Sequence, residues 1–337
     1  MVSLRVYILT RVLLTIPMVF ILLSLVFFVM RILPGDPVIA IVGMKASPEH
    51  IERLRHELGL DKPLWRQYID YIAMIMRGDL GRSMIWGKRP VSTEIWDRFP
   101  ATLELTICAF TVSVLIGLVT GVFASTKPGT KADVGLRLFS IVAYSLFIPL
   151  LGMLLQFTLG VKLKLLPVAG RKSPLVQIDR ITGLYLLDSL LTLNLVGFVD
   201  ALRYLLLPSI TLGVVLSGVY TRLVRSSMLE VLREDFIRAL RARGIPEGQI
   251  LLRHALKNAF IPVLTMMGLQ FSLLLAGAIL TETTFSWPGM GTFLLERIEY
   301  RDYTTVQGTI VFYALLVAMV SLIVDIIYAY IDPRIRY

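Results

Sequence analysis

Two short motifs in this sequence begin like catalytic signatures and then depart from them. His56-Glu57 starts like the zinc-protease pattern H-E-x-x-H, but position 60 is leucine, so the second zinc ligand is missing. Gly170-Arg171-Lys172-Ser173 ends like a phosphate-binding loop but lacks the spacing G-x-x-x-x-G-K-[ST]. A single cysteine, Cys108, provides neither a disulfide framework nor a metal cluster. We therefore predict no catalytic residue, no metal ligand and no ATP site on this chain.

The most informative feature is a basic segment, residues 222–257, which reads RLVRSSMLEVLREDFIRALRARGIPEGQILLRHALK. It lies between residues 204–221 and 259–281, which carry no charge and are long enough to cross a bilayer. A charged helical loop held between two membrane spans must lie at the membrane surface. We expect it to bind another protein there.

A short helix is predicted at the centre of this segment, beginning near Asp235, whose negative charge favours a helix start. Gly244 and Pro246 break the helix sharply. Its two sides differ: an apolar ridge is formed by Phe236, Ile237 and Leu240, and the other side carries Arg238, Arg241 and Arg243. Such a helix can be pushed as a rigid peg by a partner. The alternative is an amphipathic helix lying on anionic lipid.

Composition indicates a membrane protein. Of the 337 residues, 56% are hydrophobic and 17% are charged, whereas a soluble domain averages ~45–50% apolar and ~25% charged residues. A spanning helix needs ~20 consecutive apolar residues, and this requirement is met at residues 12–30, 105–125, 138–161, 204–221, 259–281 and 304–324. Because lipid leaves backbone polar groups without partners, these spans must be helices. We predict an all-α integral membrane protein with about six transmembrane helices.

Orientation follows from the lysines and arginines near the ends of short loops. Both termini and residues 222–257 are basic and are placed in the cytoplasm, whereas residues 33–100 and 162–202 are placed outside. The net charge of +10 follows this sidedness, so we predict no nucleic-acid partner. The predicted division is an N-terminal tail and first transmembrane helix (1–33), an external partly helical segment (34–100) and a five-helix core (101–337). Within the external segment, helices are expected to open at Pro48 and near Pro63.

Charge is scarce inside the predicted spans. Only Asp325 lies beside a span, whereas ion-driven carriers usually have ionisable groups within the membrane. This disfavours an ion-driven carrier or a channel, and the missing acid-base groups disfavour an intramembrane enzyme. Energy for transport must then enter from elsewhere, and the cytoplasmic loop is the candidate point of entry.

A bulky turn follows the fifth span, in the sequence Thr283-Thr284-Phe285-Ser286-Trp287-Pro288-Gly289. We predict that Phe285, Trp287 and Pro288 help to close a path on the external side. The alternative is an aromatic anchor at the membrane interface, where tryptophan is enriched.

Residues 222–257 resemble the coupling loop of permease subunits in ABC importers, and the chain as a whole is most similar to the first permease chain of the dipeptide, oligopeptide and nickel branch. Arg238-Ala239-Leu240 stand where the general family has Glu-Ala-Ala, and the glycine falls correctly at Gly244. The segments that carry the resemblance are GLDKPLWRQY (59–68), GDLGRS (78–83), ATLELT (101–106), DFIRALRARG (235–244), RHALKNAFIPV (253–263), ETTFSWPGMG (282–291), RDYTTVQG (301–308) and DPRIRY (332–337).

The resemblance implies a type I-like permease fold in the cytoplasmic membrane and a set of partners. A second homologous permease would pair with this chain, and each would dock one ABC ATPase subunit through its coupling helix. ATP and Mg would be bound by the ATPase subunits, with no cofactor and no catalysis on this chain. An external solute-binding protein would deliver the solute. Short peptides are the first choice, with short oligosaccharides or nickel as alternatives.

Overall fold

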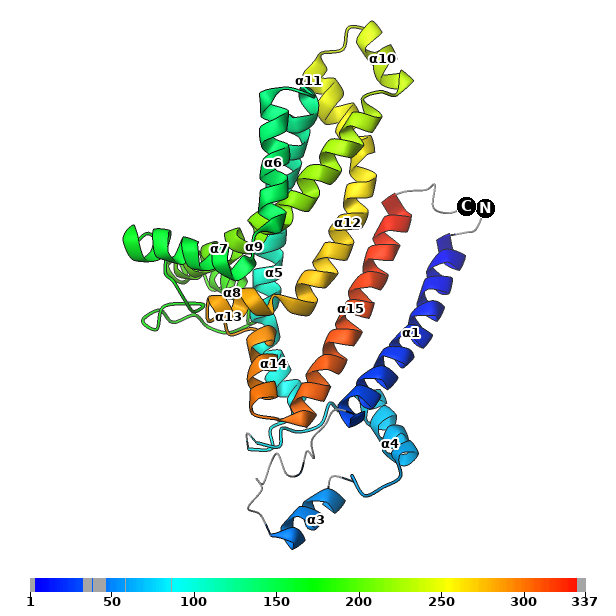
Figure 1. Ribbon diagram of the computed structural model, residues 1–337, viewed down its shortest axis with the longest axis vertical. Coiled ribbons are helices and arrows are strands. Elements are labelled where there is room, and N and C mark those ends of the chain that lie inside the picture. The colour runs from blue at the N-terminus through cyan, green and yellow to red at the C-terminus, as the bar shows by residue number, and fades with distance from the viewer. Residues whose placement is uncertain (1–3, 33–37, 39–46, 58, 86, 332–337) are drawn as a thin grey trace. The chain divides into compact units, whose positions relative to one another are not determined.

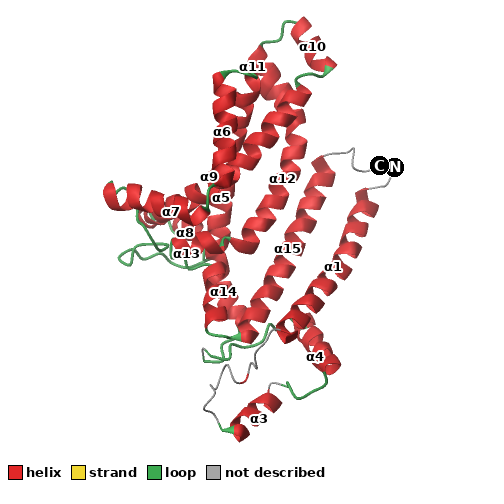
Figure 2. Ribbon diagram, in the orientation of Figure 1, coloured by secondary structure: helices red, strands yellow, loops and turns green. Residues whose placement is uncertain are grey.

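The computed structural model describes residues 4–32, 38, 47–57, 59–85 and 87–331 of the chain. Over these residues the structure is helical, and β pairing is confined to an isolated bridge between Arg82 and Pro90 (Figures 1 and 2). The predicted all-α class is confirmed. The helices are α1 (Leu4–Ile32), α3 (Pro48–Glu57), α4 (Leu64–Met76), α5 (Val91–Thr126), α6 (Lys131–Ser145), α7 (Ile148–Leu155), η1 (Gln156–Lys162), α8 (Tyr185–Leu191), α9 (Leu195–Val231), α10 (Asp235–Ala242), α11 (Glu247–Gln249), η2 (Ile250–Ala255), α12 (Leu256–Gly277), α13 (Ile279–Thr284), α14 (Met290–Glu299) and α15 (Tyr303–Ile331).

Five helical segments within the described residues are long and apolar enough to cross a membrane, and a bent pair of helices makes a sixth if it counts as one span. This agrees with the predicted number of about six. The five are Ile8–Arg31, Val91–Thr126, Leu195–Val231, Glu247–Leu275 and Tyr303–Ile327.

The third predicted span, residues 138–161, differs from a straight helix. It is divided between α6 and the α7–η1 pair, which are bent by 102° relative to each other. The break lies at Leu146 and Phe147, whose backbones are extended. Pro149 follows in the first turn of α7, where its missing N–H costs no hydrogen bond. Apolar composition alone could not reveal this break, because residues 138–161 carry no charge on either side of it.

The two helices predicted in the external segment are confirmed. Helix α3 begins at Pro48, and α4 begins directly after Pro63. Helix α4 ends before Gly78, which has a φ of +76° and donates its N–H to the carbonyl of Ile75 over 2.8 Å. A left-handed residue of this kind is a common helix end and favours glycine.

The chain divides into two compact units. The first unit draws on residues 1–100 and 289–323, and the second on residues 101–288 and 324–335. In the first unit, α1 and α4 pack around Phe27 and Tyr71. The carboxylate of Asp302 accepts hydrogen bonds from the hydroxyls of Ser83 (2.6 Å) and Thr305 (2.8 Å), and so ties residues 81–84 to the start of α15.

In the second unit, α9 is the central helix and packs on α6, α7, α8 and α12. Glycines allow other helices to approach it closely. A Cβ added to Gly213 would meet Cγ1 of Val112 in α5 at 2.6 Å, and one added to Gly218 would meet the carbonyl oxygen of Ser140 in α6. Small residues at helix contacts are typical of membrane bundles, where close backbone approach supplies much of the stability.

The loop between η1 and α9 is also fixed to this unit. The guanidinium of Arg171 donates to Oε2 of Glu104 from Nε (3.0 Å) and Nη2 (2.6 Å), and Nη2 also donates to the carbonyl of Gly183. It lies 3.9 Å from the ring centroid of Tyr185. A buried ion pair with this many additional contacts is compensated for the loss of water. The sequence had indicated no role for this loop, and the pair shows that it is an ordered part of the second unit.

The glycine contacts lead to a test of the packing of α9. Gly213→Ala should lower the midpoint of thermal unfolding of the purified permease, because overpacking typically costs ~1–3 kcal/mol. Gly135→Ala in α6 is the matched control, since a Cβ there meets no atom within 4 Å. Alanine favours an isolated helix over glycine by ~0.5–1 kcal/mol, so the control should be neutral or stabilising. Equal midpoints for the two variants would contradict the close contact.

Candidate functional site

The predicted helix in the basic segment is confirmed as α10, Asp235–Ala242. The break after it is also confirmed, since Gly244 has a φ of +72° and donates its N–H to the carbonyl of Arg241 over 2.9 Å. Pro246 follows in an extended conformation and leads into α11. A Cβ at Gly244 would meet no atom within 4 Å. Any other residue at this position therefore carries a backbone penalty and no packing penalty.

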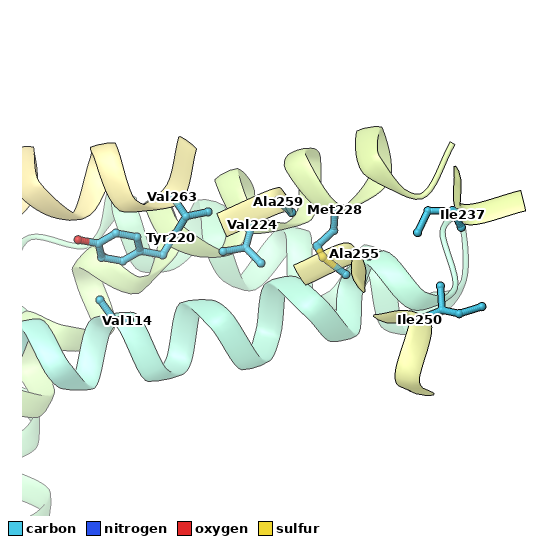
Figure 3. Close-up of a cluster of buried hydrophobic side chains, with 9 residues drawn as sticks. All are labelled: Val114, Tyr220, Val224, Met228, Ile237, Ile250, Ala255, Ala259 and Val263. Atoms are coloured by element: carbon cyan, nitrogen blue, oxygen red, sulfur yellow. The ribbon is translucent and has the colours of Figure 1, made fainter. Parts of the chain in front are cut away.

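The predicted apolar ridge is divided by the fold. Ile237 has 0% of its surface exposed, and Leu240 is half-buried against the same cluster, whereas Phe236 is 42% exposed. Figure 3 shows Ile237 beside Ile250 at one end of this row of buried side chains. The cluster consists of Val114, Tyr220, Val224, Met228, Ile237, Ile250, Ala255, Ala259 and Val263. The expectation of one partner-facing ridge is corrected: Ile237 and Leu240 attach α10 to the chain, and Phe236 remains at the surface.

The fold explains this division. Helix α10 packs on η2, the π-helical turn between α11 and α12, and Ile237 belongs to the same buried cluster as Ile250 and as Met228 near the end of α9. Among the exposed residues, Phe236, Ala239 and Arg243 are three and four residues apart and so lie on one side of the helix. That spacing was present in the sequence. We grouped Phe236 with Ile237 and Leu240 instead, because hydrophobicity alone does not distinguish a side chain that packs within the chain from one that binds a partner.

The arginines of α10 are held by local ion pairs. Arg238 contacts Asp235 at 3.2 Å, and both side chains are exposed. Arg241 donates to both carboxylate oxygens of Glu247 at 2.7 and 3.2 Å, which raises the pKa of the guanidinium through this hydrogen bond. The second pair closes the turn at Gly244 across the break between α10 and α11. Arg241 thus stabilises the turn, although exposed pairs typically contribute only ~0–1 kcal/mol.

A further ion pair near the same end of the bundle was missed by sequence reasoning. Nε and Nη2 of Arg225, in α9, donate to the two carboxylate oxygens of Asp133 at 2.6 and 2.9 Å. The N–H of Gly129 donates to the same carboxylate at 2.9 Å. This pair joins the start of α6 to α9, close to the loop that carries α10. In the sequence, Asp133 lies just before one predicted span and Arg225 lies just after another, so both could be placed at the cytoplasmic side. The sequence does not say, however, which of its many arginines pairs with Asp133.

The predicted gate residues lie in the interior of the second unit. Phe285 and Trp287 are 2% and 1% exposed, and Pro288 is half-buried. Nε1 of Trp287 donates to the carbonyl of Ala101 over 2.9 Å, and its ring packs in a cluster with Leu105 and Leu205. An anchor at the membrane interface would expose its ring. In this conformation both aromatic rings are core residues, so any role in closing a path would require this turn to move.

Comparison with known proteins identifies the family of transport proteins that this chain resembles. The family described as "Binding-protein-dependent transport system inner membrane component" matches residues 113–337, and the N-terminal component of the same systems matches residues 4–106. The chain is 45% identical to the di/tripeptide transport system permease protein of Pseudomonas aeruginosa (strain UCBPP-PA14), over 96% of both chains. It is 43% identical to the dipeptide transport system permease protein of Escherichia coli (strain K12), over 98% of both. Identity to the glutathione transport system permease protein of the same strain is 39%, over 98% of this chain and 99% of that one.

A solved structure confirms the fold. An inward-facing structure of the MetNI methionine ABC transporter matches with a TM-score of 0.52 and 17% identity, covering 72% of this chain and 96% of that one. The fold is thus that of an ABC importer permease, as the sequence motifs predicted. The chain belongs to the family of inner membrane components of binding-protein-dependent transport systems, and within it to the branch of the dipeptide permeases. It is a multi-pass membrane protein and a permease subunit.

The divided ridge leads to a test of how α10 is attached. Ile237→Ala removes a fully buried side chain, and such truncations typically cost ~2–5 kcal/mol. Here the loss should appear as local opening, so amide hydrogen exchange across residues 235–245 should accelerate at least about thirtyfold for a loss of about 2 kcal/mol. Phe236→Ala is the control, because its exposed side chain contributes little to this contact. Equal exchange in the two variants would show that Ile237 does not hold the helix.

Proposed function

We propose that this chain forms half of the translocation path for short peptides in an ATP-driven importer. A second homologous permease would form the other half. Two ABC ATPase subunits would bind ATP and Mg, and each would dock on the coupling helix of one permease. An external solute-binding protein would deliver the peptide. This chain would bind no cofactor itself and catalyse no reaction.

The observation that carries the proposal is the double character of α10. Its inner side is anchored by the fully buried Ile237, and its outer side presents Phe236, Ala239 and Arg243. A helix that only rested on lipid would turn its apolar side chains toward the membrane. Instead the exposed Phe236 lies on the same side as Arg243, which follows the last residue of α10, and the helix is flanked by breaks on both sides. This favours a protein partner that receives the phenylalanine in a pocket and the arginine at its rim.

The proposed mechanism uses the attachments of α10. Closure of the ATPase subunits on ATP would displace the exposed face of α10. Because Ile237 is packed against Ile250 and the end of α9, the displacement would be passed to α9 and, through η2, to α12. Those two helices belong to the second unit. Tilting of this unit would open the translocation path alternately to one side of the membrane and to the other. Phe285 and Trp287, in the same unit, would open or close its external end as the turn after α13 is rearranged.

Peptide is favoured as the solute by the names of the relatives. The chain is 43–45% identical to permeases named for dipeptides and di/tripeptides. The glutathione system, at 39% identity, is named for a compound that is itself a tripeptide. Oligosaccharide and nickel remain the alternatives. A group of three metal-ligating side chains is not found among the described residues, and a metal could still be held wholly by the binding protein.

Docking on the ATPase can be tested with purified subunits. Phe236→Ala should weaken binding of the ATPase to the permease pair about thirtyfold or more, because a large apolar anchor at an interface typically contributes 2 kcal/mol or more. Arg238→Ala is the control on the same helix and should change the affinity by about fivefold or less, since exposed pairs contribute ~0–1 kcal/mol. The measurement is ATPase affinity in nanodiscs, with dipeptide uptake by reconstituted vesicles as the second readout. Normal binding and uptake by Phe236→Ala would exclude α10 as the docking helix.

The proposed orientation places residues 222–257 and both termini in the cytoplasm, and residues 33–100 and 162–202 outside, on the evidence of the basic residues. At the C-terminus, residues 332–337 lie outside the described part of the chain. Single cysteines can be introduced at the exposed positions Thr93 and Arg233 of a Cys108→Ala background. In intact cells an impermeant thiol reagent should label position 93 only, and after permeabilisation both. Labelling of position 233 alone in intact cells would reverse the topology.

A further inference from the structure

Helix α4 is attached to the first transmembrane helix by aromatic and polar contacts. The hydroxyl of Tyr68 forms a 2.5 Å hydrogen bond with the hydroxyl of Ser24, and the hydroxyl of Tyr71 donates to the carbonyl of Leu23 over 3.3 Å. The ring of Tyr68 stacks on Phe28 at 6.0 Å and meets Phe27 edge-on at 5.3 Å. Both tyrosine hydroxyls are therefore satisfied within the protein, as groups away from water must be.

These contacts place Tyr68 and Tyr71 beside a part of α1 that lies inside its apolar span. The apolar span of α1 ends at Arg31, and Ser24 lies seven residues before it. At a rise of 1.5 Å per residue, Ser24 is about 10 Å from Arg31 along the helix axis. The hydrocarbon core of a bilayer is ~30 Å thick, so each leaflet contributes about 15 Å. If Arg31 marks the interface, Tyr68 lies at the depth of the acyl chains.

One face of α4 is apolar and exposed. Trp65, Ile69 and Met76 are 64, 55 and 84% exposed and are separated by four and seven residues, which places them on one side of the helix. Phe28, which stacks on Tyr68, is itself exposed on α1. The apolar stripe of α4 is thus continuous with the lipid-facing surface of the first span. In water such a stripe would be an unfavourable exposed patch.

The polar face of α4 is directed elsewhere. Nζ of Lys62 donates to the carboxylate of Asp70 over 2.8 Å, and Nε2 of Gln67 donates to the carbonyl of Lys62 over 2.7 Å. Lys62, Gln67 and Asp70 line a cavity of about 230 Å³ that Arg31 also borders. These polar groups therefore border one cavity, and they do not interrupt the apolar stripe.

We propose that α4 is embedded in one leaflet of the membrane, with Trp65, Ile69 and Met76 in contact with lipid acyl chains. Lipid is favoured over a protein partner because the stripe continues the surface of α1 at the same depth and carries no polar group for specific pairing. The leaflet is the outer one if the topology proposed above is correct. Contact with lipid does not depend on that topology, nor on the solute.

Spin-label accessibility tests this inference. Single cysteines at Ile69, Met76, Arg66 and Leu25 of a Cys108→Ala background are labelled with a nitroxide, and the full transporter is reconstituted in phospholipid vesicles. Oxygen concentrates in the hydrocarbon, whereas chromium oxalate stays in water. Labels at 69 and 76 should show a ratio of oxygen to chromium oxalate accessibility equal to that of Leu25, which is exposed on α1. The ratio at Arg66, exposed on the polar side, should be at least fivefold lower.

Two outcomes would overturn the proposal. Access of chromium oxalate to 69 and 76 at the level of position 66 would place the stripe in water. Protection of both positions from oxygen and chromium oxalate together would show that another protein covers it. The labelled side chains are exposed, so the substitutions leave the contacts between α4 and α1 intact. The outcome is independent of whether residues 222–257 dock an ATPase, which the Phe236 variant tests separately.

Discussion

The absence of hydrogen-bonding partners in lipid is the constraint on which this structure depends. It makes the spans helical, and it also determines where polar side chains can lie. Hydroxyls within the spans donate back to their own helix, as Thr111 does to the carbonyl of Ile107 and Thr211 to that of Leu207. The indole N–H of Trp287 donates to the carbonyl of Ala101 in α5. These polar groups therefore find their partners inside the protein, without reaching water.

Attachment and exposure are combined in α10, and this combination distinguishes it from an ordinary surface helix. Ile237 lies fully inside the second unit while Phe236, the adjacent residue, is 42% exposed. The buried contact resists displacement of α10 relative to α9 and η2. In the proposed mechanism, a force applied to the exposed face would consequently be transmitted to the bundle and would not merely bend the loop. A helix lacking either contact could bind a partner or be part of the fold, but it could not couple the two.

Element type could be predicted from the sequence, whereas side-chain partners could not. Apolar length identified the spans, proline and glycine marked α3, α4 and the end of α10, and charge identified the loop. Three features depended on tertiary contacts. The bend after Ser145 lies within an uncharged stretch, Ile237 packs inward while Phe236 does not, and Trp287 is buried against Ala101. In each case the hydrophobic pattern was read correctly, but it does not state whether lipid, a partner or the chain itself covers the apolar group.

The pair formed by Asp133 and Arg225 extends the group of helices that α10 can move. Bidentate hydrogen bonds and the N–H of Gly129 compensate the carboxylate for its burial, and separating the two helices would leave that charge unpaired. Close packing at Gly218 joins the same two helices farther along. Helix α6 is thus fixed to α9 at two points, and α12 packs on α9 as well. A displacement of α10 that reaches α9 must therefore carry α6 and α12 with it, so the movement that we propose for α10 would be that of a packed group and not of a single span.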